Sequence, residues 1–288
     1  MTTELCHLSC VMCYFNGPKA RRGTTTLDPD LVLKVLSSRP KNEKILFVAT
    51  GEFFSDPNAL LYIRMASELG LWPRVITHGQ LLTPEFIDRI LAAGLKELLI
   101  SVDSIDKNQY AKIRRGGTLD VILNACAYFK QKKMADTDLR LGITVICFPK
   151  SNHSREEVVD FWRERVDYIQ FVSEYYDVFQ LRRLFFLPDR RVNCSLKLIP
   201  LPSGYVAPCC AIAIYSHDHD VSWLPHLANV SPKQAYDELC NMYEDQASPL
   251  AHICTKCNWW TQFYTNEKGN TPIFEMIEFN HAADQSSQ

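Results

Sequence analysis

The sequence has no long apolar run and no strong excess of charge of either sign. No stretch approaches the ~20 consecutive apolar residues that cross a bilayer, and no positively charged segment followed by an apolar one opens the chain. Its 31 basic and 33 acidic residues give a formal net charge of −2, which supplies no overall basic field for phosphates. We therefore expect a cytoplasmic protein that binds neither membranes nor nucleic acid.

Cysteine, in contrast, is abundant. The 288-residue chain contains 11 cysteines, and 47% of its residues are hydrophobic, enough for an ample buried core. Because thiols stay reduced in the cytoplasm, these cysteines are not expected to form disulfides. Their number therefore points to metal binding.

Three of the cysteines, Cys6, Cys10 and Cys13, stand close together, and no fourth cysteine follows nearby. A cubane iron-sulfur cluster normally takes four cysteines, so a set of three leaves one iron with an open coordination position. Half of a zinc site is the alternative, with His7 as the fourth ligand. Because His7 is adjacent to Cys6, and adjacent residues rarely chelate one tetrahedral ion without strain, we favour the cluster.

Strand-like apolar runs alternate with segments of helical periodicity along the first part of the chain. We expect strands at 44–50, 74–77, 98–103, 139–147 and 168–172, and helices at 59–69, 84–93, 120–130 and 156–166. A short segment before Cys6 would be a further, first strand. This order predicts an α/β fold with a parallel sheet and helices outside it, as an open sheet or a barrel.

In either architecture a ligand lies at the carboxyl ends of the strands. The runs that follow three of the expected strands are Thr50-Gly51-Glu52, Thr77-His78-Gly79 and Ser101-Val102-Asp103. Each could also be structural, since Glu52 and Asp103 could cap helices and the glycines could serve as turns.

The C-x3-C-x2-C spacing followed by Tyr14 resembles the signature of the radical S-adenosylmethionine (radical SAM) superfamily. The resemblance implies a partial (β/α)6 parallel barrel and a [4Fe-4S] cluster held by Cys6, Cys10 and Cys13. It also implies that S-adenosylmethionine chelates the open iron, that Tyr14 packs near the adenine, and that a flavodoxin-type or ferredoxin-type reductant is a partner.

The three strand-end runs resemble, in order, the Gly-Gly-Glu, Thr-Asn-Gly and Ser-x-Asp motifs of that superfamily. By this resemblance Gly51 and Thr77 belong to the cofactor site, Glu52 accepts from the cofactor amine, and Ser101 and Asp103 lie near its ribose. This chain departs from those motifs at two positions, with Thr50 in place of the first glycine and His78 in place of the asparagine.

Arg114 and Arg115 are candidates to hold the methionyl carboxylate, because the guanidinium geometry suits a bidentate contact. We expect only one of them, Arg114, to point inward. The other is expected to be a solvated surface charge.

After residue 180 the strand–helix alternation ends. We therefore predict two domains, a radical SAM core over 1–180 and a small cysteine-rich domain over 181–288. The second domain carries Cys194, Cys209, Cys254 and Cys257. Four cysteines make a complete shell, which suits an electron-transfer or stabilising cluster, and a zinc ribbon is the alternative.

The segment 203–209, with its glycine turn and Pro-Cys, resembles the hairpin of SPASM/twitch auxiliary domains, as do 227–230 and a helix over 232–242. No cysteine follows Cys257, so the resemblance implies one auxiliary [4Fe-4S] cluster, in the shorter twitch form. Cys210 competes with Cys209 as the ligand.

Of the other cysteines, Cys126 on an expected helix is best explained as a small buried hydrophobe. Cys147 ends an expected strand and is a candidate to donate a hydrogen atom to a substrate radical. Such a donation would resemble that of the radical epimerases. Cys210 and Cys240 are the other candidates.

The resemblance implies an enzyme that reductively cleaves S-adenosylmethionine to a 5′-deoxyadenosyl radical and abstracts a substrate hydrogen. We expect oxidation or epimerisation of a small molecule or short peptide. The alternatives are a peptide-modifying maturase that forms a cross-link and a non-catalytic metal-binding or electron-transfer protein. Because the cysteine motif starts at residue 6, we expect any leader-peptide-binding function to reside in a separate partner.

Overall fold

The computed structural model describes residues 1–13, 25–133, 138–146, 152–172, 196–217, 219–255 and 274–279. Tyr14, Cys147, Cys194 and Cys257 therefore lie outside the described residues. No helix in the described part of the chain is long and apolar enough to cross a membrane.

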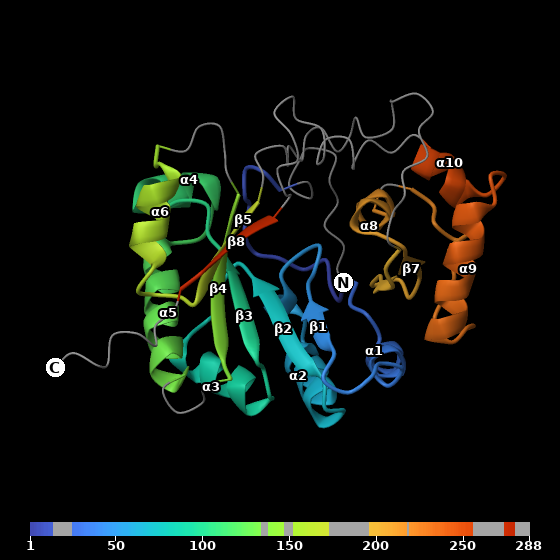
Figure 1. Cartoon of the computed structure of the whole chain (residues 1–288), viewed down its shortest axis with the longest axis horizontal. Coiled ribbons are helices and arrows are strands. Elements are labelled where there is room, and N and C mark those ends of the chain that lie inside the picture. The colour runs from blue at the N-terminus through green and yellow to red at the C-terminus, as the bar shows by residue number, and fades with distance from the viewer. Residues whose placement is uncertain are drawn as a thin grey trace.

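A six-stranded sheet forms the centre of the larger part of the molecule (Figure 1). Its strands are β1 (Lys44–Phe47), β2 (Trp72–Thr77), β3 (Glu97–Ser101), β4 (Arg140–Ile146), β5 (Tyr168–Val172) and β8 (Phe274–Glu278). They lie in the order β1-β2-β3-β4-β5-β8, and neighbours from β1 to β5 are parallel. The predicted α/β class with a mostly parallel sheet is confirmed.

Helices connect the successive parallel strands, as right-handed βαβ units require. They are α2 (Ala59–Glu68), α3 (Pro84–Ala92), α4 (Lys107–Ile113), α5 (Leu119–Lys133) and α6 (Arg155–Trp162). Helix α1 (Pro29–Leu36) precedes β1, and a short 3-10 helix, η2 (Phe53–Ser55), follows it. Helix α3 starts as the sequence predicts, because the Thr83 side chain accepts from Phe86 N and Pro84 takes the first helical position.

The two faces of the sheet differ sharply in chemistry. Alternate residues such as Val75, Leu98 and Ile143 point to the helix-covered face and belong to the main hydrophobic core. The residues between them point to the opposite face, which we call the inner face. At the amino ends of the strands the inner face carries charged side chains, among them Arg74 and Glu97.

Strand β8 comes from the C-terminal segment, which was predicted to belong to the smaller domain. It pairs antiparallel with β5, with Met276 opposite Gln170. The segment before Cys6 lies beside the chain that follows β1, since Thr2 N donates to Val48 O and Glu52 N to Leu5 O. The expected first strand therefore exists as short backbone pairing, and the outer strand beyond β5 is β8.

The smaller part of the molecule has its own hydrophobic core, which includes Val206, Leu227 and Leu239. Its elements are β6 (Ile199–Pro200), β7 (Val206–Ala207), α8 (Cys210–Tyr215), α9 (Pro232–Glu244) and α10 (Pro249–Thr255). Strands β6 and β7 form the hairpin predicted from the sequence, and Gly204 turns it with φ +86°. The predicted helix from Pro232 is α9.

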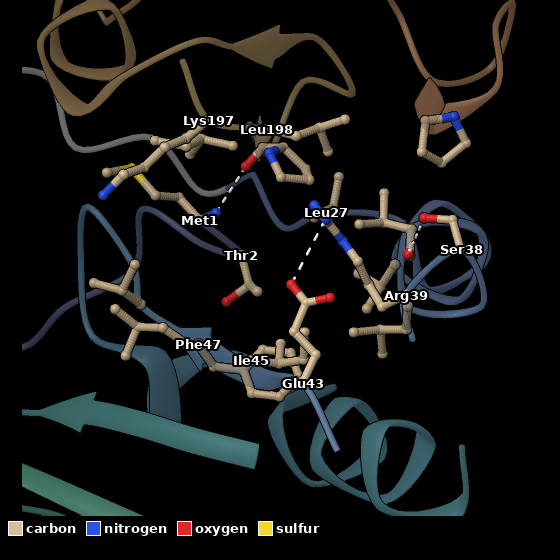
Figure 2. A pocket seen from close by; sticks show the side chains of 18 of the residues that line it. Met1, Thr2, Leu27, Ser38, Arg39, Glu43, Ile45, Phe47, Lys197 and Leu198 are labelled. Atoms are coloured by element: carbon tan, nitrogen blue, oxygen red, sulfur yellow. Dashed lines mark hydrogen bonds and ion pairs between the residues drawn. The ribbon is translucent and has the colours of Figure 1, made fainter. Parts of the chain in front are cut away.

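Contacts through α1 join the two parts. The Lys34 ammonium donates to Leu227 O at 2.5 Å, and Leu31 packs against both hydrophobic cores. A cavity of about 790 Å³ lies between α1, the outer edge of β1 and residues 196–200 (Figure 2). Among the candidate site residues that the structure describes, Cys210 alone lines this cavity, and the described cofactor-site candidates lie elsewhere.

The Tyr168 ring lies directly over Gly142 of the neighbouring strand. A Cβ added to Gly142 would stand 2.2 Å from the ring carbon Cζ. We therefore expect Gly142→Ala to lower the free energy of unfolding by about 1–3 kcal/mol through overpacking, measured by urea unfolding. In a Tyr168→Leu background the same change should cost clearly less, because the ring is gone. An equal cost in both backgrounds would contradict this account of the contact.

Candidate active site

The loop that carries Cys6, Cys10 and Cys13 is anchored on the end of α4. Ser9 N donates to Arg115 O and Val11 N donates to Ile113 O, both at 2.9 Å. These two bonds lie on either side of Arg114 and on either side of Cys10. Leu8 is fully buried beneath the loop. The loop is therefore fixed where the chain leaves β3 and α4, at the carboxyl side of the sheet.

The three thiols are close enough to influence one another electrostatically. Burial raises the pKa of the Cys10 thiol, the Arg114 guanidinium lowers it, and Cys13 and Cys6 raise it again. Among the described residues, no three His, Cys, Asp or Glu side chains converge on a single metal ion. In a cubane cluster each thiolate binds a different iron, so its cysteines do not have to converge on one point. Three neighbouring thiols beside a cation thus fit a cluster.

Arg114 points inward, as predicted, whereas Arg115 is exposed. The Arg114 Nε atom donates to Asp103 Oδ2 at 2.7 Å, and both residues are buried. Burial disfavours the charged guanidinium, but the carboxylate of Asp103 and the Cys10 thiol outweigh it and raise the pKa of Arg114. The pair therefore places one fixed cation directly beside the cysteine loop.

Glu52 is buried, with 3% of its surface exposed, and its carboxylate accepts three hydrogen bonds. The donors are Thr77 Oγ1 at 2.5 Å, His78 N at 2.8 Å and Phe54 N at 3.2 Å. Burial raises the pKa of Glu52, and the bonds from His78 N and Thr77 lower it. Glu52 caps η2, as the alternative of a purely structural role predicted, because one carboxylate oxygen accepts from Phe54 N. The other oxygen accepts from His78 N, just after the end of β2. Neutral donors leave the carboxylate suited to a cationic ligand.

His78 links this carboxylate to the cysteine loop. Its ring stands edge-on to the His7 ring with 4.7 Å between centroids, and its Nδ1 lies 3.5 Å from Glu52 Oε2. Gln80 N donates to the same Nδ1 at 3.0 Å. From the sequence His7 was a candidate zinc ligand alone, and its contact with His78 was not predicted, because two residues 71 positions apart meet only through the fold.

Gly51 has a steric reason to be glycine. A Cβ at this position would lie 2.1 Å from Leu5 O, so only glycine lets the segment before the cysteine loop pass this closely. Thr77 belongs to the Glu52 cluster through its hydroxyl, and Ser101 ends β3 with a half-buried side chain. The predicted cofactor-site residues Gly51, Glu52, Thr77 and Asp103 are thus gathered at one edge of the sheet.

The cysteines of the smaller part face different surroundings. Cys209 precedes α8 and its sulfur accepts from Ile212 N at 3.5 Å, and Cys254 lies on α10; both pack against the smaller hydrophobic core. Cys210 is exposed and lines the cavity in Figure 2, and Cys240 is half-buried on α9. Cys126 is buried on α5, as predicted, and burial raises its pKa to about 12.

A family model of the Radical SAM superfamily matches residues 1–161, which include the cysteine loop, the Arg114–Asp103 pair, the Glu52 cluster and the His7–His78 contact. The chain belongs to the radical SAM superfamily. The family implies a [4Fe-4S] cluster and S-adenosylmethionine, and the three thiols beside Arg114 fit the cluster.

Curated relatives match half or somewhat more of this chain. A GTP 3′,8-cyclase of Alkaliphilus oremlandii is 26% identical over 172 residues, 57% of this chain and 51% of that protein. An AdoMet-dependent heme synthase of Methanosarcina barkeri is 27% identical over 146 residues, 50% of this chain and 40% of that protein. The chain thus matches about half the length, or less, of these relatives.

Two solved structures share the fold over most of the chain. BtrN in complex with AdoMet and 2-DOIA has a TM-score of 0.50 and 15% identity, with 89% of this chain and 90% of that chain covered. Streptococcus suis SuiB bound to precursor peptide SuiA has a TM-score of 0.55 and 14% identity, with 88% and 69% covered. At these identities the likeness concerns the fold.

Loss of the buried Asp103 carboxylate should be costly, because it leaves the Arg114 guanidinium buried without its ionic partner. We expect Asp103→Ala to lower the free energy of unfolding of the metal-free protein by about 3 kcal/mol in urea unfolding. The matched control is Asp120→Ala, which breaks the exposed ion pair with Lys107 (2.6 Å) and should change stability little. Equal effects of the two substitutions would refute the role assigned to the buried pair.

Proposed function

We propose that this enzyme reductively cleaves S-adenosylmethionine and abstracts a hydrogen atom from its substrate, leading to oxidation or epimerisation of a small molecule or short peptide. The observation that supports it most directly is the position of Cys10 beside Arg114, with the loop bonded to the backbone on both sides of that arginine. Cluster and cofactor, when bound, supply the 5′-deoxyadenosyl radical.

Each residue of the site has a role in this proposal. Cys6, Cys10 and Cys13 hold the cluster, and Glu52 accepts from the cofactor ammonium, for which a buried carboxylate surrounded by neutral donors is suited. Arg114 attracts the methionyl carboxylate. Asp103 holds the guanidinium in place through the 2.7 Å contact, and in this way positions Arg114.

The site residues not yet mentioned complete the cofactor pocket in the proposal. Ser101 hydrogen-bonds the ribose, and Tyr14, which lies outside the described residues, packs near the adenine. Gly51 lets the cysteine loop approach, and Thr77 orients Glu52 through its hydroxyl. Cys147 and Cys240 remain candidate hydrogen donors for an epimerisation, whereas Cys210 lines the cavity beside β1, away from the cofactor-site residues.

We further propose that residues 181–288 hold one auxiliary [4Fe-4S] cluster through Cys194, Cys209, Cys254 and Cys257. Cys209 and Cys254 pack against the same small hydrophobic core, whereas Cys210 faces the cavity beside β1. This difference favours Cys209 over Cys210 as the ligand. Such a cluster would accept the substrate electron in an oxidation.

A cross-linking peptide maturase is the second candidate. It is favoured by the likeness in fold to SuiB, which was solved with its precursor peptide. In that case a separate leader-binding protein would deliver the peptide. A flavodoxin-type or ferredoxin-type protein is the proposed reductant in either case.

Anaerobic reconstitution tests the proposal. We expect about eight irons per chain, from two cubane clusters, and formation of 5′-deoxyadenosine from S-adenosylmethionine after reduction with dithionite. The variant with Cys6, Cys10 and Cys13 all replaced by alanine should lose about half of the iron and all cleavage. Cys126→Ala is the matched control and should keep both. Bound zinc without cleavage in the wild type would exclude the radical mechanism.

Alkylation distinguishes the two adjacent cysteines of the smaller part. In the reconstituted protein, iodoacetamide should modify Cys210, which is exposed, and leave Cys209 unmodified as a cluster ligand; mass spectrometry of peptides reports both. Cys126 should stay unmodified with or without iron, because it is buried and its pKa is about 12. Protection of Cys210 with modification of Cys209 would reverse the assignment.

A further inference from the structure

Three uncharged polar side chains form a row across the inner face of the sheet. Ser101 of β3 is paired in register with Thr144 of β4, and Thr144 is paired with Gln170 of β5. Their sequence neighbours Ile100, Ile143 and Ile169 belong to the main hydrophobic core, so the three polar side chains point to the other face. We call these three residues the polar row.

The polar row lies at the carboxyl side of the inner face, above a network of charged side chains. Toward the amino ends, Arg74 Nε lies 2.9 Å from Glu97 Oε1, and the Tyr168 hydroxyl donates to Glu97. Arg140 forms an ion pair with Glu278 at 2.8 Å and lies over the Tyr168 ring. These charged groups pair with one another at the amino end of the inner face.

The polar row differs from that network because its groups do not satisfy one another. Within the part of the chain that the structure describes, none of its three side chains hydrogen-bonds to the protein, although each is half-buried. Half-buried hydroxyl and amide groups gain stability from a partner that donates and accepts hydrogen bonds. A row of such groups at the carboxyl ends of parallel strands is where a ligand is expected in this architecture.

The three residues of the polar row lie at different distances from the proposed cofactor site. Ser101 lies on the strand next to β2, whose end carries Thr77 and the contact to Glu52. Thr144 and Gln170 lie one and two strands farther away, and two strand spacings amount to ~10 Å. Thr144 and Gln170 therefore extend from the proposed cofactor site toward β8, where Met276 stands opposite Gln170 with half of its surface exposed.

We propose that Thr144 and Gln170 bind the substrate through an uncharged group that both donates and accepts hydrogen bonds, an amide or a hydroxyl, and that Met276 provides an apolar contact beside it. The glutamine amide and the threonine hydroxyl each carry a donor and an acceptor. The row contains no charged side chain to neutralise a carboxylate or an ammonium. This inference rests on the proposed function, because it takes the cofactor to lie beside Ser101.

Two probes test the inference on the reconstituted protein, N-acetylalanine methylamide for an amide and myo-inositol for a hydroxyl. Saturation-transfer NMR is recorded in the presence of S-adenosylhomocysteine, which cannot be cleaved reductively in the same way. We expect transfer to at least one probe with the wild type. The probe that binds distinguishes a peptide-like substrate from an alcohol. No transfer to either probe at high millimolar concentration would overturn the proposal.

The variants Thr144→Val and Gln170→Leu remove the hydrogen-bonding groups with little change in shape. Each should weaken probe binding about tenfold, the effect of one lost hydrogen bond. The matched controls are Thr118→Val and Gln131→Leu, which make the same chemical changes at exposed positions and should bind the probe as the wild type does. Unchanged probe binding in the row variants would overturn the proposal.

Affinity for S-adenosylmethionine, measured on the same samples, provides the second readout. It should change by less than about twofold in Thr144→Val and Gln170→Leu, because these residues lie away from the cofactor groups. A loss of cofactor affinity that equals or exceeds the loss of probe binding would assign the row to the cofactor instead and refute the inference. Failure of the wild type to form 5′-deoxyadenosine would refute the proposed function separately.

Discussion

The buried ion pair between Arg114 and Asp103 is the interaction on which the rest of the site depends. It joins the chain just after β3 to the end of α4, and the cysteine loop is hydrogen-bonded to the residues on both sides of Arg114. Position and charge are therefore coupled, because the same contact that holds the loop in place also puts a cation beside Cys10. Without the Asp103 carboxylate, the Arg114 guanidinium would be a buried, unpaired charge. The segment that supports the cysteine loop would then no longer be fixed.

The two faces of the sheet carry different kinds of side chain, and so do its two ends. The helix-covered face is mostly hydrophobic and supplies the main core. On the inner face, charged side chains at the amino ends pair with one another, whereas uncharged polar groups at the carboxyl ends do not. The uncharged polar groups of the row therefore lie at the end where a parallel α/β sheet binds its ligands.

The smaller part of the molecule has its own hydrophobic core and contacts the larger part through α1. The last described strand, β8, pairs with β5 of the main sheet. This return path means that the C-terminal segment contributes to the same inner face as β4 and β5. The smaller unit and the inner face of the sheet are therefore linked through one chain segment as well as through packing.

Local sequence patterns predict the alternation of strands and helices, the cysteine loop, and the strand ends at which Glu52, Thr77 and Asp103 lie, because these depend on local periodicity and on residues close in the chain. The fold was needed to show that Arg114 pairs with Asp103, that His7 meets His78, and that β8 lies beside β5. Those contacts join segments distant in sequence, and no local pattern specifies which buried charge or strand edge will meet which. The polar row has the same origin, since Ser101, Thr144 and Gln170 become neighbours only through strand register.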